Sequence, residues 1–158
     1  DGLFSYADKD RILEIMKDSR IGTNGTVVLI LYFITKTILI SEVISVNPKY
    51  LIIFPIIARL STSTNAGLSN YAKKSGMSNS IIDENGIFEV IFALILTNFL
   101  VFFIVGINGT AITFIAFLFI IFFMINVRKK IGGITGDTMG ASLELTSILV
   151  LFLAILFK

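Results

Sequence analysis

The sequence has no cysteine, no histidine and no tryptophan, and it has only two prolines among 158 residues. Without cysteine the chain can form neither a disulfide nor a thiol nucleophile, and without histidine it lacks an imidazole base and the usual zinc ligands. Any catalysis must therefore use carboxylates, hydroxyls, lysine, arginine or an oxygen-bound cation. The net charge of +2 is too small to indicate a nucleic acid partner.

Hydrophobic residues, by contrast, make up 55% of the chain. They occur in blocks that approach the ~20 residues needed to cross a bilayer. We therefore predict an all-α fold, a polytopic transmembrane helix bundle that forms one membrane domain over residues 1–158. The predicted spans cover approximately residues 26–45, 50–69, 87–106, 110–127 and 141–157.

The first 25 residues have a different, amphipathic character. Ser5 and Asp8 are both suitable N-caps for a helix that continues to about Lys17, with apolar residues on one face and charges on the other. Gly22 and Gly25 follow this helix. The pattern predicts an interfacial helix on the cytoplasmic bilayer surface. Because the chain opens with an acidic residue and no initiator methionine, we expect it to be the C-terminal part of a longer protein.

Several predicted spans contain polar residues. Lys36 must snorkel, pair with an acid or line a polar cavity, because a buried lysine is costly. Arg59 is suited to gripping a phosphate, and equally to forming a salt bridge with Glu42 or Glu144. The polar residues that follow Arg59, up to Asn65, must face other helices or a water-filled cavity.

Turn and charge signals predict how the spans are arranged. The Asn108–Gly109 pair predicts a tight turn that joins spans three and four as an antiparallel hairpin. Basic residues concentrate in segments 1–25, 70–86 and 128–140, which five spans would place on one side. Lysine and arginine favour the cytoplasmic side, so these segments should converge there on one site.

The stretch from Gly132 to Ala141 carries the strongest chemical signal. It combines glycines, threonines and Asp137, and Glu144 follows on the same predicted helix face. Acidic residues beside a membrane helix are costly to bury and are therefore candidates for function. The alternative is helix packing through small residues, with Gly136 and Gly140 as a GxxxG contact.

Three classes of function remain open from the residues alone. Carboxylates, hydroxyls and basic residues without histidine or cysteine suit an enzyme that uses Mg²⁺ and a phosphate ester. A transporter could instead line its path with Lys36, Arg59, Asp137 and Glu144. A packing subunit without a site is the third class, and it leaves the polar cluster unexplained.

Two long stretches resemble a known family. Residues 1–4 with residues 11–25, and residues 132–141 with Glu144, are similar to the cobalamin synthase family, the adenosylcobinamide-GDP ribazoletransferases. Arg59 and the Tyr71-Ala72-Lys73 run also fall at family-like positions. The resemblance covers nearly the whole chain. It implies a multi-pass enzyme in the cell membrane of a prokaryote, with its site facing the cytoplasm.

The resemblance also implies a reaction and its partners. The enzyme would join adenosylcobinamide-GDP to α-ribazole, or to its 5′-phosphate, with Mg²⁺ as cofactor, and would release GMP with adenosylcobalamin or its phosphate. The expected partners are these substrates, the lipid bilayer and, as one option, a second copy of the chain. The alternatives are a CDP-alcohol-type phosphotransferase and a small membrane transporter.

Site residues follow from the same resemblance. We expect Asp1 and Asp137 to be catalytic, as metal ligands or as the base, with Glu144 as a further metal ligand. The residues expected to bind phosphate or substrate are Arg20, Arg59, Lys73, Lys74, Gly22, Gly133, Gly136 and Thr135. The family has an aspartate-rich motif just before the position of Asp1, so we predict little or no activity for this chain alone.

Overall fold

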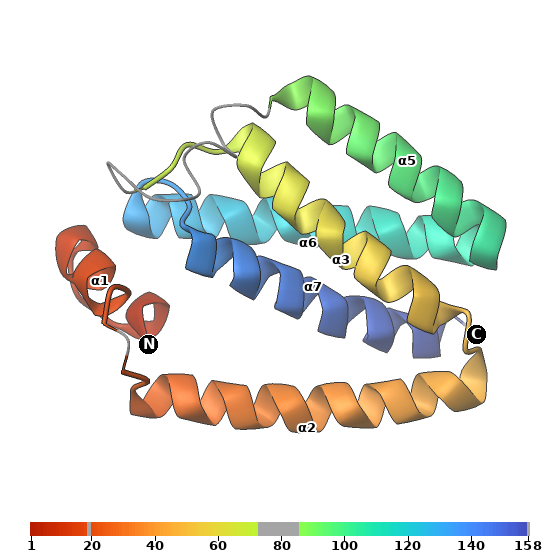
Figure 1. Cartoon of the computed structure of the whole chain (residues 1–158), viewed down its shortest axis with the longest axis horizontal. Helices are drawn as coiled ribbons and strands as arrows, with labels where there is room; N and C mark the ends of the chain where they lie inside the picture. Colours follow the sequence, from red (N-terminus) through yellow and green to blue (C-terminus); the bar gives the residue numbers. More distant parts are fainter. Residues whose placement is uncertain (19, 73–85, 158) are drawn as a thin grey trace.

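The computed structural model of the chain describes residues 1–18, 20–72 and 86–157. These ranges are almost entirely helical (Figure 1). The only β pairing within them is an isolated parallel bridge between Tyr71 and Ile134. The elements are η1 (Gly2–Phe4), α1 (Lys9–Ile15), α2 (Thr23–Val46), α3 (Tyr50–Leu68), α5 (Ile87–Val105), α6 (Ile107–Ile131) and α7 (Gly136–Leu156).

Five of these helices, α2, α3, α5, α6 and α7, are long and apolar enough to cross a membrane. The predicted all-α bundle with five spans is therefore confirmed. Helix ends differ from the predicted spans by a few residues, most clearly at α7, which begins at Gly136 rather than at 141. Hydropathy misses this polar first turn because local capping, not apolar character, starts the helix.

The spans alternate in direction, which gathers the polar segments at one end of the bundle (Figure 1). Helices α2, α5 and α7 begin at this end, and α3 and α6 finish there. Helix α1 and the chain's N-terminus lie at the same end. The described parts of segments 1–25, 70–86 and 128–140 therefore converge, as the sequence predicts.

The connection between α5 and α6 differs from the predicted turn. Gly106 alone joins the helices, with a positive φ of 73° that favours glycine. Asn108 and Gly109 already belong to α6, so the predicted Asn-Gly turn is wrong although the helix hairpin is confirmed. Gly109 has a packing role instead of a turn role. A Cβ at this position would lie 2.3 Å from a methyl group of Val105, so only glycine lets the end of α5 come this close.

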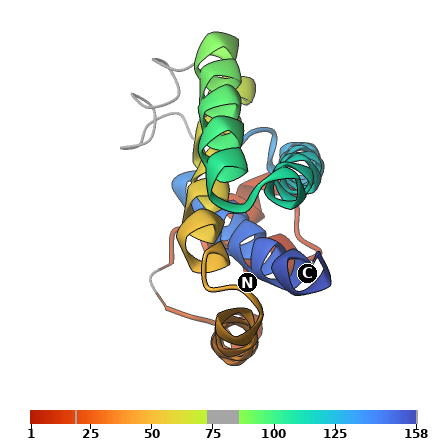
Figure 2. The ribbon, with the colours of Figure 1, turned by 90° about the vertical axis from the view of Figure 1, so that its right-hand side faces the viewer.

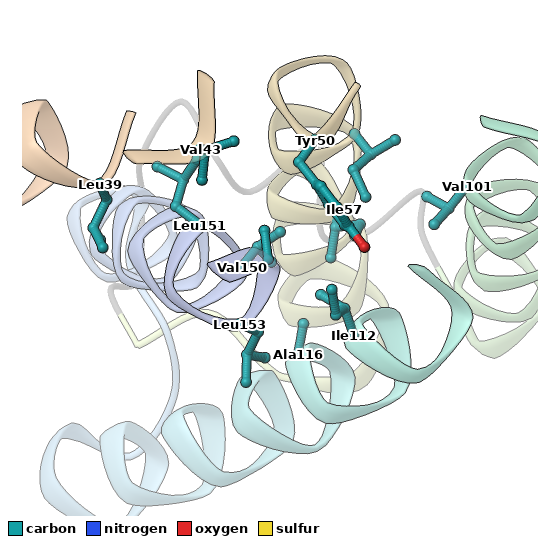
Figure 3. Packing of buried hydrophobic residues seen from close by; sticks show 12 residues of the cluster. Leu39, Val43, Tyr50, Ile57, Val101, Ile112, Ala116, Val150, Leu151 and Leu153 are labelled. Carbon is teal, nitrogen blue, oxygen red and sulfur yellow. The ribbon is translucent and has the colours of Figure 1, made fainter. Parts of the chain in front are cut away.

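Helix α7 lies at the centre of the bundle and packs against α2, α3 and α6 (Figure 2). Figure 3 shows Val150, Leu151 and Leu153 of α7 among side chains from the other four spans. The polar half of α3 also faces α7: the buried Asn65 side chain donates to the Ser142 hydroxyl at 3.0 Å. The expectation that this polar half faces other helices is thus confirmed.

Helix α1 packs on the end of the bundle. Asp8 caps it by accepting from the Arg11 backbone N–H at 3.1 Å. Ile12 is buried in a cluster with Met124, Val127 and Ile131 of α6. The apolar face of α1 therefore serves the contact with α6, and the bilayer-surface position of this segment stays a prediction.

Candidate functional site

The loop between α6 and α7 is held tightly by its neighbours. Gly132 ends α6 in the left-handed region, with φ 77°. Ile134 donates its backbone N–H to the Asn70 carbonyl at 2.9 Å, and its own carbonyl accepts from Ala72 at 2.8 Å. A Cβ on Gly133 would lie 2.5 Å from the Asn70 oxygen. Gly133 is therefore required for this close backbone approach, and a ligand role for it stays a prediction.

Thr135 starts α7 as its N-cap. Its side chain is fully buried and accepts from the Thr138 backbone N–H, while the Thr138 hydroxyl accepts from the Thr135 N–H at 2.8 Å. This reciprocal cap occupies the hydroxyl that we expected to bind phosphate. The cap leaves Gly136 and Asp137 exposed in the first turn of α7.

The basic triplet at the end of α6 also has a structural role. Arg128 donates to the Leu68 carbonyl at 3.2 Å, and Lys130 donates to the Leu3 carbonyl. Cations in the last turn of a helix interact favourably with its dipole. These contacts hold the end of α3 and the η1 segment beside the start of α7.

Asp1 binds the start of α2. Its two carboxylate oxygens accept from the backbone N–H groups of Gly22 and Gly25, each at 2.8 Å. Helix N-termini offer unpaired N–H groups and a positive dipole end, so a carboxylate is stabilised there. A Cβ on Gly22 would lie 2.7 Å from Asp1 Oδ1, and one on Gly25 would lie 2.5 Å from Oδ2. Both glycines are thus needed for the carboxylate to approach.

Asp1 and Asp137 line one cavity at the polar end of the bundle, with a volume of about 1160 Å³, which we call the polar cavity. The starts of α2 and α7 both open into it, so two helix N-termini face the same space. The sequence-predicted residues that line it are Asp1, Asp137, Arg20 and Gly22. Its charged lining is completed by Arg11, Glu14 and Asp18.

Each guanidinium of the polar cavity has a carboxylate partner. Arg11 contacts Glu14 at 2.5 Å, and Arg20 contacts Asp18 at 2.8 Å. The side-chain hydrogen bond from Arg20 lowers the pKa of the Asp18 carboxyl, and the same bond raises the pKa of Arg20. Arg20 therefore enters the cavity as a fixed positive charge. Its side chain is 88% exposed and remains accessible to an anion.

Glu144 lies elsewhere, two helical turns and roughly 10 Å along α7 from Asp137. It forms an ion pair with Lys36 of α2 at 2.8 Å, and the Tyr32 hydroxyl also donates to it. Lys36 thus pairs with an acid, one of the outcomes that the sequence predicts. The structure brings Asp1 and Asp137 to one cavity but does not bring Glu144 there.

The other predicted site residues that the structure describes do not line the polar cavity. Arg59 is exposed on α3, and within the described ranges it forms no ion pair, so the expected bridge to Glu42 or Glu144 is wrong. Lys36 takes this role for Glu144. Lys73 and Lys74 lie outside the described residues. A Cβ on Gly140 would have no neighbour within 4 Å, so the alternative of a GxxxG contact at Gly140 is not seen among the described residues.

The oxygen atoms that line the polar cavity are of the kind that a hard cation binds, with the substrate supplying the remaining ligands. Magnesium prefers oxygen ligands and is typically held by one or two carboxylates together with phosphate oxygens. Asp1 and Asp137 supply such oxygens, and the bonds from Gly22 and Gly25 hold the Asp1 carboxylate in place. Among the described residues, no group of three or more acidic side chains lies close enough together to hold a metal ion by itself. Substrate oxygens would therefore have to contribute to its coordination.

Sequence reasoning missed two contributors. Tyr32 belongs to the Lys36–Glu144 cluster, and its position one turn before Lys36 is the signal that could have indicated it. Gly25 is not among the predicted site residues, but its backbone N–H donates to Asp1. The spacing of Gly22 and Gly25, an N-cap and the third residue of a helix, was the available signal.

Comparison with known proteins decides the family. The profile of the family described as cobalamin-5-phosphate synthase matches residues 1–155. The chain belongs to the cobalamin-5-phosphate synthase family. Relatives named adenosylcobinamide-GDP ribazoletransferase include one from Caldanaerobacter subterraneus subsp. tengcongensis, 35% identical over 94% of this chain, and one from Clostridium acetobutylicum, 38% identical over 92%.

The chain spans 61% of the Caldanaerobacter relative and 58% of the Clostridium relative. A relative from Fusobacterium nucleatum, 35% identical over 97% of this chain, is covered over 64% of its length. No solved structure matches the chain. With its five apolar spans and this family membership, the chain is a multi-pass membrane protein.

The contact between Gly25 and Asp1 gives a first prediction. A glycine-to-alanine change within a helix normally stabilises by about 1 kcal/mol. At Gly25 the new methyl group displaces the Asp1 carboxylate, whose capping bonds stabilise by about 1 kcal/mol. Because the two effects offset each other, Gly25→Ala should not raise the apparent Tm in detergent, whereas Asn24→Ala in the same turn leaves the Asp1 contacts intact and should raise it slightly. A more stable Gly25→Ala variant would show that Asp1 does not cap α2.

The cluster at Glu144 gives a second prediction. A double-mutant cycle with Lys36→Met and Glu144→Gln should give a coupling energy of about 1–3 kcal/mol in thermal unfolding, because each single change leaves its partner without its contact. The matched cycle with Arg59→Met and Glu144→Gln should be additive within about 0.5 kcal/mol. Equal coupling in the two cycles would contradict the observed pairing.

Proposed function

We propose that the protein is an adenosylcobinamide-GDP ribazoletransferase. It joins adenosylcobinamide-GDP to α-ribazole, or to α-ribazole 5′-phosphate, and releases GMP. The observation that carries this proposal is the polar cavity, where Asp1 and Asp137 lie at two helix N-termini, within a chain of the cobalamin-5-phosphate synthase family. The names of the relatives point to the same reaction.

The reaction is a phosphoryl transfer. A ribose hydroxyl of the ribazole attacks the phosphorus on the cobinamide side of the diphosphate, a new P–O bond forms, and the bond to the GMP oxygen breaks. Since α-ribazole 5′-phosphate would keep its phosphate in the product, the attacking group is a ring hydroxyl of the ribose. The hydroxyl proton passes to a carboxylate of the polar cavity, and either Asp137 or Asp1 can accept it.

The chain's charges suit this transfer, which depends mainly on positioning and charge neutralisation. Arg20 holds a permanent positive charge at the cavity wall and offers its exposed guanidinium to the diphosphate. The N-termini of α2 and α7 add positive dipole ends. Asp1 is oriented by the two glycine N–H groups, so it does not have to reorganise when substrate binds.

Asp1 and Asp137 are the residues that would hold Mg²⁺. When bound, this cation would neutralise charge on the diphosphate and the leaving group. We place the polar cavity on the cytoplasmic side of a prokaryotic cell membrane, because the basic residues concentrate at this end of the bundle. We also propose that the 158-residue chain has little activity without the further part that its relatives possess.

A product assay tests the proposal. Proteoliposomes with the full-length protein receive adenosylcobinamide-GDP and α-ribazole, and GMP release is followed together with the corrinoid product. Product should require Mg²⁺ and disappear with EDTA. Asp137→Asn should lower kcat by about 10²-fold or more, because it removes a charged ligand or proton acceptor.

Glu42→Gln is the matched control. This exposed carboxylate lies near the far end of α2, and it lines neither the polar cavity nor the second cavity, which Glu144 lines. It should leave the rate unchanged. The proposal fails if correctly inserted protein gives no product, or if Asp137→Asn works as fast as the unaltered protein.

A further inference from the structure

A second cavity, which we call the apolar groove, lies between α2 and α6 with α7 as its floor. Figure 1 shows α7 between these two helices. The groove has a volume of about 790 Å³, within the range of small-molecule sites. Its walls are mostly aliphatic and aromatic, and Phe4 and Phe123 contribute rings. Such walls favour a flat, uncharged group.

The apolar groove is continuous with the polar cavity. Five residues line both spaces: Leu3, Phe4, Val28, Leu29 and Ala141. A ligand with a polar end and an apolar end could therefore occupy both at once. Its polar end would lie beside Asp1 and Asp137, and its apolar end would lie between α2 and α6.

Gly140 keeps the floor of the apolar groove open. Packing does not require a glycine there, because an added Cβ would meet no atom of the described residues within 4 Å. Gly140 and its neighbour Ala141 thus form a stretch of α7 almost without side chains, at the junction of the two cavities. Because a Cβ fits there without a close contact, a side chain at this position would extend into the groove and narrow it.

Polar groups on the groove walls distinguish a nucleoside from a lipid chain. The contacts of Glu144 with Lys36, Tyr32 and Ser147 all use Oε2, and its side chain is 45% exposed. Glu144 lies one turn of α7 beyond Gly140, so its other oxygen can accept from a ribose hydroxyl that points from the polar cavity into the groove. The exposed Thr35 hydroxyl, without a hydrogen bond in the described part of the chain, can donate to a ring nitrogen. An acyl chain would satisfy neither group.

We propose that the apolar groove binds the base of α-ribazole while its ribose lies at the polar cavity. This inference rests on the proposed function and assigns the second substrate a place. The ribazole base is a flat, uncharged two-ring system that fits between two helices. The cobinamide macrocycle is much broader and carries many amides, which need more hydrogen-bond partners than the few polar groups of these walls supply.

The test narrows the groove and measures each substrate separately. Gly140→Leu should raise the KM for α-ribazole about tenfold or more, because a pocket discriminates strongly against groups that no longer fit. The KM for adenosylcobinamide-GDP should stay the same. Equilibrium binding of labelled α-ribazole to proteoliposomes, without adenosylcobinamide-GDP, should weaken by the same factor. Leu156→Phe is the control, since it adds volume to an exposed position of α7 outside both cavities.

A second variant covers the case that Gly140→Leu does not insert. Gly140→Ala should bind α-ribazole nearly normally but exclude an analogue with a third fused ring, relative to the unaltered protein. An unchanged KM for α-ribazole in well-inserted Gly140→Leu, or an increase only in its KM for adenosylcobinamide-GDP, would overturn the inference, as would normal binding of the three-ring analogue by Gly140→Ala. Copurification of a lipid in the groove, together with normal ribazole binding by Gly140→Leu, would also overturn it.

The two proposals can fail separately. Product formation by the unaltered protein with no effect of the Gly140 variants on ribazole would remove the groove assignment and leave the proposed function intact. Ribazole binding that depends on Gly140, without any product, would remove the transferase function and keep the groove as a nucleoside site.

Discussion

The bilayer imposes the constraint on which this architecture depends. Spans that cross a membrane alternate in direction, so α2, α5 and α7 must begin at the same end of the bundle (Figure 1). Two positive helix ends, those of α2 and α7, therefore open into one cavity. Asp1 and Asp137 lie there because carboxylates are stabilised at helix N-termini, and the backbone geometry thus gathers two carboxylates and two helix N-termini around one cavity.

Charge and apolar surface are separated along α7. Its first turn presents Asp137 to the polar cavity, and two turns later Glu144 faces the apolar groove while paired with Lys36. The ion pair connects α2 to α7 inside the bilayer, where an unpaired charge would be costly. Residues of α2 and α7 thus line both the polar cavity and the apolar groove. This arrangement suits a substrate with one polar and one apolar end.

The fold was largely predictable from the sequence, because hydropathy over ~20 residues directly reports membrane spans. Helix ends were less predictable, since Thr135 and Gly106 act through local capping and dihedral preference. The concentration of basic residues on one side of the five spans correctly predicts that Asp1 and Asp137 lie at the same end of the bundle. The partner of Glu144 was not predictable, because the sequence does not say which helix packs beside α7. The packing role of Gly133 likewise depends on a loop, residues 70–72, that is far away in the sequence.

The central claim is that Asp1 and Asp137 together hold a divalent cation in the polar cavity. Mn²⁺ can replace Mg²⁺ as a paramagnetic probe, and the chain's lack of cysteine lets a spin label be attached at Ile21→Cys in the cavity and, as a control, at Phe152→Cys on α7. The account predicts that Mn²⁺ broadens only the signal from position 21, and that an added Asp1→Asn/Asp137→Asn double change abolishes this broadening. Broadening that persists in the double variant, or that never occurs at position 21, would contradict it.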